Sequence, residues 1–298
     1  RDHLQANNYR IDVNAKLGHD DDKTEFVEDA HKTLEQRYEA FSHYVEQDDW
    51  DLFFGVFMTT DRVNHFLFKD YEQDGEYQQE FFDFYRKVDE YLGKLRDQLA
   101  DDVTMVVASD HGFTTLEYEV HFNEWLEQQG LLDFSTDDHS ELGDISEDAT
   151  AYSLIPGRFY INLDGREPNG GVSEDDYEDV RDDLKEKLES LEGPNGNKVA
   201  DRVVTREDAF RGDHSDIAPD LVVVPNHGFD LKAGFKGSED VFGVGPRNGM
   251  HSFDNATLMV DDAEARIQDA DLYDITPTIL DLMDHDYDRT EFNGSSLV

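Results

Sequence analysis

Two side chains of types that bind metal ions follow the apolar run 52–60. Asp61 and His65 are four residues apart, so on a helix the carboxylate and the imidazole lie on one face and can reach a common ion. An acidic residue and a histidine at this spacing also occur as an ordinary solvated pair on a helix surface. The apolar run before them is what favours a pair of ligands.

A second pair follows the apolar run 103–108. Asp110 and His111 are neighbours, so they share an ion only if the backbone turns sharply, and Gly112 permits such a turn. The dipeptide Asp-His occurs five times in the sequence, which a chain so rich in aspartate produces partly by chance. The apolar run before this pair and the glycine after it distinguish it from the other four.

A further candidate ligand, His251, stands much later in the chain, after Gly249 and Met250. Alone it would be an ordinary histidine. Carboxylate and imidazole ligands together suit zinc or manganese better than calcium or copper. The residue types therefore predict a site for a divalent ion, with zinc favoured and manganese as the alternative.

The elements that must position these residues alternate between helix and strand. Apolar periodicity predicts helices over 24–47 and 77–99, and continuous apolar runs predict strands over 51–59 and 103–108. Continuous apolar strands are typical of parallel sheets covered by helices on both faces. Ligands bind beyond the carboxyl ends of such strands, where both candidate pairs stand.

The rest of the chain continues the alternation of helix and strand. Helices are predicted over 123–129, over 173–191 with Ser173 as N-cap, and over 271–283 with Pro277 inside; strands over 158–163, 221–225 and 257–260; and an acidic loop over 133–150. The fold class expected is α/β, with a mostly parallel sheet sandwiched by helices. We expect one domain over residues 1–298 with an inserted subdomain at roughly 113–250.

Composition excludes several classes of protein. The net charge of −45 comes from 71 acidic and 26 basic residues, and such a field repels nucleic acids and anionic lipids. No apolar run is long enough to span a bilayer as a helix, and the absence of cysteine excludes disulfides and thiolate metal sites. Carboxylates spread along the whole chain indicate a folded protein of a salt-accumulating cytoplasm, because concentrated salt screens their repulsion.

The order of motifs resembles the alkaline phosphatase superfamily, in particular its type I phosphodiesterase/nucleotide pyrophosphatase branch and the related phosphohydrolase/phosphomutase proteins. The segments that carry the resemblance are Asp61 with His65, 109–113, 122–126, 218–223, 249–252, 272–280 and 292–297. By position, the resemblance implies that Asp61, His65 and His251 hold one metal ion and that Asp110 and His111 hold a second.

The same resemblance implies two-metal phosphoryl transfer on a small phosphorylated substrate. In the family, a threonine or serine nucleophile and a further aspartate precede the region that resembles this chain. The chain begins with Arg1, so we expect both groups upstream of it, with weak metal binding and little turnover by these residues alone.

Three functions remain open at this stage. The full-length protein is expected to be a metal-dependent phosphodiesterase or phosphomonoesterase. Phosphomutase or sulfatase chemistry at the same ions is the first alternative, and a cysteine in place of the upstream nucleophile would favour a sulfatase. A non-catalytic, truncated metal-binding relative is the second alternative.

Overall fold

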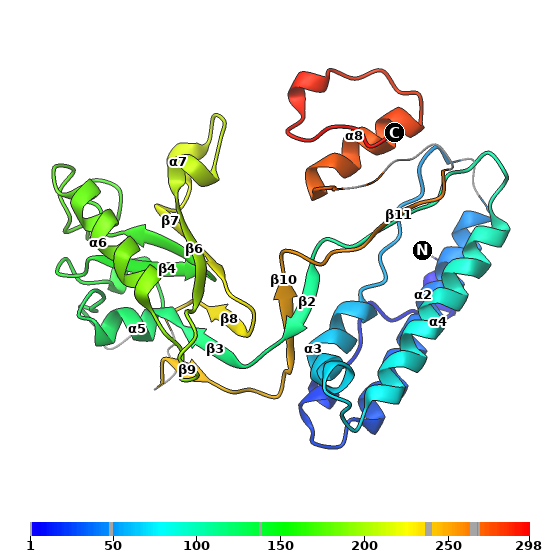
Figure 1. Cartoon of the computed structure of the whole chain (residues 1–298), viewed down its shortest axis with the longest axis horizontal. Coiled ribbons are helices and arrows are strands. Elements are labelled where there is room, and N and C mark those ends of the chain that lie inside the picture. The colour runs from blue at the N-terminus through cyan, green and yellow to red at the C-terminus, as the bar shows by residue number, and fades with distance from the viewer. Residues whose placement is uncertain (1, 48–49, 137–138, 236–239, 263–266, 268) are drawn as a thin grey trace. The chain divides into compact units, whose positions relative to one another are not determined.

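The computed structural model describes residues 2–47, 50–136, 139–235, 240–262, 267 and 269–298. The chain forms two compact units, of which the first comprises Arg1–Thr115 with Pro246–Val298 and the second comprises Leu116–Gly245. Both are drawn in Figure 1, and each is described by itself.

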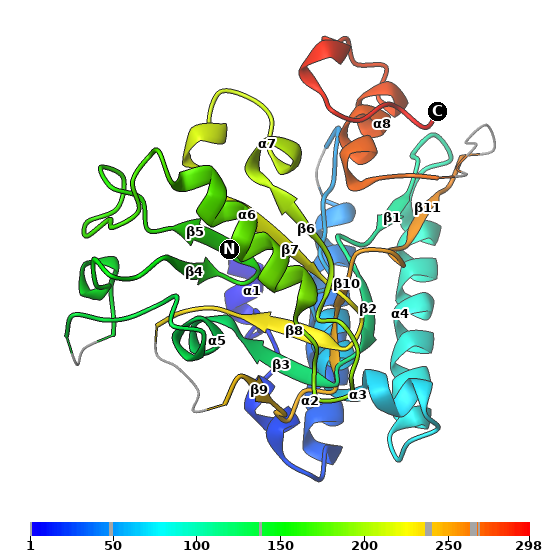
Figure 2. The same ribbon diagram turned by 60° about the vertical axis from the view of Figure 1, so that its left-hand side comes forward.

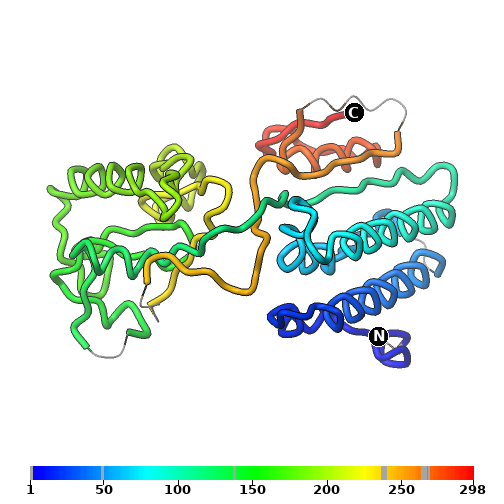
Figure 3. The backbone as a smooth tube through the Cα atoms, turned by 60° about the horizontal axis from the view of Figure 1, so that its bottom comes forward, coloured from blue at the N-terminus to red at the C-terminus, as the bar shows by residue number. Residues whose placement is uncertain are grey.

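Three long helices form the core of the first unit. They are α2 (Thr24–Val45), α3 (Thr59–Glu72) and α4 (Gln78–Gln98). Buried residues recur on α4 every three or four positions, at Phe81, Phe84, Val88, Tyr91 and Leu95, which places them on one face of the helix. That face packs with buried residues of α2 and α3, and Figure 3 shows the helices as neighbouring coils.

Two short antiparallel pairs and several small helices complete the first unit. Strand β1 (Val106–Ala108) pairs with β11 (Leu258–Val260), and β2 (Gly112–Thr115) pairs with β10 (Gly249–Ser252). The remaining elements are α1 (Asp2–Ala6), η1 (Ala15–His19), η4 (Leu272–Asp274), α8 (Ile275–Leu282) and η5 (Arg289–Glu291).

The second unit contains two sheets and the helices that cover them. Its strands are β3 (Tyr118–His121), β4 (Ala151–Ile155), β5 (Arg158–Ile161), β6 (Ala200–Thr205), β7 (Leu221–Pro225), β8 (Phe229–Lys232) and β9 (Phe242–Gly243). Its helices are α5 (Phe122–Gln128), η2 (Leu142–Asp144), α6 (Tyr177–Ser190), α7 (Arg206–Ala209) and η3 (Ser215–Ile217). The sheet orders are β4-β5-β7-β6 and β8-β3-β9. Helix α6 lies against the four-stranded sheet (Figure 2), with Leu184 and Leu188 buried in the shared core.

The α/β class is correct, but the expected mostly parallel sheet is wrong for the described residues. Among their named strands only β3 and β8 pair in parallel, and every other pairing is antiparallel. The apolar run 103–108 is predicted as a strand of a parallel sheet, yet β1 pairs antiparallel with β11, about 150 positions later. An apolar run indicates a strand, but the direction of its partner depends on the path of the distant chain.

The predicted strand over 51–59 is also wrong. Residues Leu52–Phe57 belong to no helix or strand, and Leu52, Phe54 and Val56 are 55%, 79% and 46% exposed. Phe53 and Phe57, between them, pack against Phe41 of α2. The segment therefore keeps the alternation of a strand, but no described strand pairs with its backbone.

The helix predictions agree closely with the structure, except that two helices begin later than predicted, α6 at Tyr177 and α8 at Ile275. Helices α2, α4 and α5 confirm the predictions over 24–47, 77–99 and 123–129. Helix α6 begins at Tyr177, so Ser173 is not its N-cap; the Ser173 hydroxyl instead accepts the Asp176 backbone N–H in the preceding turn. Pro277 is the third residue of α8, where a helix needs no backbone N–H.

No helix in the part of the chain that the structure describes is both long and apolar enough to cross a membrane.

Candidate metal centre

Helix α3 brings the first two candidate ligands together. It begins at Thr59, so Asp61 and His65 lie one turn apart on the same face. The Nε2 atom of His65 lies 3.5 Å from Oδ1 of Asp61. The helical spacing predicted from the sequence is therefore present, and His65 is buried while Asp61 is half-buried.

Strand β10 delivers the third ligand from a distant part of the sequence. Pairing with β2 sets His251 opposite Phe113. The strand is also attached to α3, because the backbone N–H of Asn248 donates to the carbonyl of His65 at 2.8 Å. This attachment requires Gly249: a Cβ atom there would lie 2.2 Å from the carbonyl oxygen of Asn64.

The three ligand atoms have the spacing of a tetrahedral metal site. Nε2 of His251 lies 3.1 Å from Oδ1 of Asp61 and 3.1 Å from Nε2 of His65. The remaining distance, between Nε2 of His65 and Oδ1 of Asp61, is 3.5 Å. Bonds of about 2.0–2.1 Å to a tetrahedral zinc ion would place the ligand atoms about 3.3–3.4 Å apart. The side chains of Asp61, His65 and His251 therefore fit a single ion of this size.

The second nitrogen of His65 fixes the orientation of its ring. Nδ1 lies 3.0 Å from the carbonyl oxygen of Gly249, an acceptor only, so Nδ1 carries the proton and Nε2 is free to bind an ion. A metal-binding histidine commonly donates its other ring N–H to such a carbonyl.

The charge states of the two α3 ligands also suit a cation. Burial alone would raise the pKa of Asp61, but the hydrogen bond from His251 and the positive charges around it outweigh burial, so its pKa lies below the ordinary value. Burial lowers the pKa of His65 and outweighs the attraction of Asp61. An ionised carboxylate and a neutral imidazole are the forms that bind metal ions.

The second predicted pair lies next to this triad, but its two members differ. The His111 ring stacks on the His251 ring with centroids 3.8 Å apart, and its Nε2 lies 3.9 Å from Oδ1 of Asp61. Nε2 of His111 is 3.5 Å from Oδ1 of Asp110, whose side chain is 80% exposed. His111 thus joins the cluster, while Asp110 lies at its exposed edge.

Gly112 has a different role from the one expected. Its φ angle is not in the positive region, so no unusual turn requires it. A Cβ atom there would instead overlap the Asn255 side chain. Asn255 donates to the carbonyl of Phe113 at 2.8 Å and accepts from the Ser252 hydroxyl, and these contacts tie the loop after His251 to β2.

Two charged residues near the centre were not predicted from the sequence. Arg62 donates to Oδ2 of Asp61 at 3.0 Å and also contacts Asp12. The only signal in the sequence was the position of Arg62 directly after a candidate ligand, and its side-chain partners depend on the fold.

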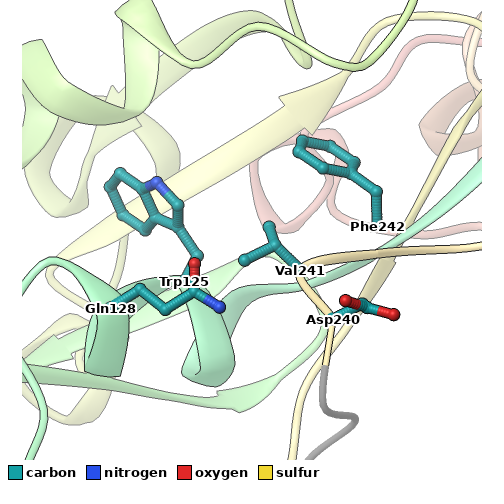
Figure 4. A pocket seen from close by; sticks show the side chains of 5 residues that line it. All are labelled: Trp125, Gln128, Asp240, Val241 and Phe242. Carbon is teal, nitrogen blue, oxygen red and sulfur yellow. The ribbon is translucent and has the colours of Figure 1, made fainter.

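A hollow of about 560 Å³ occurs in the second unit. It is lined by Trp125, Gln128, Asp240, Val241 and Phe242, and Figure 4 shows these side chains. None of the five candidate ligands lines it. Its mixture of aromatic and polar groups has no arrangement suited to phosphoryl chemistry, so the candidate site is the metal-ligand cluster of the first unit.

Comparison with known proteins gives one match. The model of a family described as type I phosphodiesterase / nucleotide pyrophosphatase matches residues 2–254. No curated protein and no solved structure matches the chain significantly. The matched segment contains all five candidate ligands.

Proposed function

The chain belongs to the type I phosphodiesterase/nucleotide pyrophosphatase family of the alkaline phosphatase superfamily, and from this premise we propose that it carries the metal centre of a phosphodiesterase or phosphomonoesterase. The family implies hydrolysis of phosphoric esters and small phosphorylated substrates. The observation that carries the proposal for this chain is the spacing of Asp61, His65 and His251, whose three ligand atoms lie within 4.8 Å of one another.

The residues of this chain would bind and orient the reacting groups. Asp61, His65 and His251 would hold one divalent ion, and Asp110 with His111 would contribute to a second. Zinc is the favoured ion and manganese the alternative, since the ligand set mixes imidazole with carboxylate. Ions bound at this centre would polarise a phosphoryl oxygen and lower the pKa of an attacking hydroxyl.

Further parts of the proposal rest on the family resemblance and on composition. A threonine or serine upstream of Arg1 would supply the nucleophile and a further aspartate the remaining ligand. The acidic composition favours a salt-accumulating cytoplasm as the place of action.

The first experiment measures zinc binding to the 298-residue chain by titration calorimetry. The wild-type chain is expected to bind zinc, and Asp61→Asn should remove that binding because the carboxylate is the only negatively charged ligand of the three. Asp83→Asn is the matched control, since Asp83 is an exposed carboxylate on α4 that pairs with Arg86. Equal zinc affinity in all three proteins would contradict the metal centre.

The second experiment measures hydrolysis of a chromogenic phosphodiester by this chain and by the full-length gene product. We expect activity in the full-length product and its loss in the same product carrying Asp110→Asn. Turnover by the 298 residues alone would contradict an upstream nucleophile. Activity retained after Asp110→Asn would remove that residue from the centre.

A further inference from the structure

We propose that Arg62, held in place by Asp12, is a positioning residue that restricts Asp61 to a single ligand oxygen and thereby sets the ion preference of the centre. The inference rests on the metal centre proposed above, and it concerns which ion that centre prefers.

The two carboxylate oxygens of Asp61 have different partners. Oδ1 faces the imidazoles of His251 and His65, at 3.1 Å and 3.5 Å. Oδ2 accepts a hydrogen bond from Nη1 of Arg62 at 3.0 Å. An ion bound by the two imidazoles can therefore coordinate Oδ1 of Asp61, while Oδ2 stays hydrogen-bonded to the Arg62 guanidinium.

Arg62 is itself fixed by a second carboxylate. Its Nε and Nη2 atoms donate to Oδ2 of Asp12 at 3.0 Å and 2.8 Å. The other oxygen of Asp12 accepts the backbone N–H of Val13 at 2.8 Å. The planar guanidinium thus spans Asp12 and Asp61, which a lysine ammonium could not do with the same geometry.

The number of available carboxylate oxygens discriminates between ions. Zinc prefers four ligands in a tetrahedral arrangement, and one oxygen with two imidazoles supplies three of them. Manganese prefers sites richer in oxygen, so it gains more when both oxygens of Asp61 become available. Because both ions carry two positive charges, the loss of the Arg62 charge alone would change the zinc and manganese affinities similarly. A change in the ratio of the two affinities therefore reports how many oxygens of Asp61 are available to the ion.

The test is titration calorimetry with zinc and with manganese on the 298-residue chain, comparing wild type with Arg62→Gln. We expect the preference for zinc over manganese to fall about 10-fold, the lower end of the effects seen when a partner of a metal ligand is removed. Asp12→Asn should shift the ratio in the same direction but less, because Arg62 then keeps its bond to Asp61. Arg62→Lys retains the charge, and its ratio of zinc to manganese affinity should lie between those of wild type and Arg62→Gln.

Arg10→Gln is the matched control. Arg10 makes two hydrogen bonds to Asp29 in the same unit, and its side chain is 28% exposed against 31% for Arg62. This variant should keep the wild-type ratio. A ratio unchanged in Arg62→Gln, with wild-type zinc binding intact, would overturn this inference and leave the metal centre standing; absence of zinc binding by wild type would overturn both.

Discussion

Individual carboxylates in this chain have two contrasting environments. Asp61 faces the imidazoles of two histidines, with which it could bind a metal ion. Asp220 of the second unit is instead surrounded by hydrogen-bond donors of the protein itself. The Asp220 side chain is 0% exposed and accepts from Arg166 at 2.6 Å and 2.9 Å, from Tyr177 at 2.7 Å and from the backbone of Ile161 at 2.7 Å. Arg206 also contacts it. Asp220 therefore has a structural role.

We predict that Asp220→Asn lowers the free energy of unfolding by about 3–5 kcal/mol near neutral pH, because it removes the buried anion that pairs with the guanidinium groups of Arg166 and Arg206. Burial alone would raise the pKa of Asp220, but the hydrogen bonds from Arg166, Tyr177 and Ile161 outweigh it, and the pKa lies below its ordinary value. The stabilisation is therefore complete above the pKa of the unfolded chain and is lost as the pH falls through the lower folded value.

Urea unfolding followed by tryptophan fluorescence at a series of pH values measures this prediction. The difference between wild type and Asp220→Asn should shrink as the solution becomes strongly acidic. Asp183→Asn is the control, since Asp183 is a 59% exposed carboxylate of α6 paired with Lys187, and it should leave stability nearly unchanged. A difference that stays constant with pH would contradict the role assigned to the ionised Asp220.

At the scale of elements, the centre depends on the contact between β10 and α3. Gly249 lies where the strand meets the helix, and a Cβ atom there would lie 2.2 Å from the Asn64 carbonyl oxygen and 2.7 Å from Cβ of Phe68. The glycine is therefore needed for close approach, and its place two residues before His251 couples that approach to the position of a ligand.

We predict that Gly249→Ala destabilises the protein by about 1–3 kcal/mol, the usual range for overpacking, and weakens zinc binding because His251 moves away from Asp61. Thermal unfolding and calorimetry measure the two effects. Gly93→Ala on α4 is the control: a Cβ atom there meets nothing within 4 Å, so it should stabilise by about 0.5–1 kcal/mol through helix propensity. Wild-type zinc affinity in Gly249→Ala would refute the coupling.

The apolar segment before α3 gives a second prediction at this scale. Phe54 is 79% exposed, whereas Phe84 of α4 is 1% exposed. Phe54→Ser should change the free energy of unfolding by less than about 0.5 kcal/mol, and Phe84→Ala should lower it by about 3–5 kcal/mol. Comparable losses in both variants, measured by chemical unfolding, would mean that another chain covers Phe54 in solution.

At the scale of the whole molecule, repulsion among the acidic side chains opposes folding. A net charge of −45 on 298 residues opposes compaction in dilute buffer, while the Debye length falls to about 3 Å at 1 M salt. We therefore predict that the melting temperature rises steeply between low and molar KCl. Equal melting temperatures in the two solutions, measured by circular dichroism, would remove the argument for a salt-accumulating cytoplasm.

The organisation of the chain as one domain with an insertion stays a prediction. If it is correct, thermal unfolding followed by calorimetry should show a single transition.

The sequence by itself determined the helices and the candidate ligands. Helices α2 and α4 follow from apolar residues recurring every three or four positions, which is a local property. Asp61 and His65 could likewise be recognised because four residues on a helix span one turn. The apolar run before Asp110 and Gly112 after His111 also singled out that pair, but only the family resemblance connected His111 and His251 with Asp61 and His65, since nothing in their local spacing links them to α3.

Only the tertiary structure decided how the strands pair and which side chains surround the ligands. The direction of β1 depends on β11, and the partners of Asp61 include Arg62 and, through it, Asp12. Strands β1 and β11, and likewise Arg62 and Asp12, are far apart in the chain, and they meet only where the folded backbone brings both partners together. Local patterns record how a segment coils, but not which distant segment lies against it.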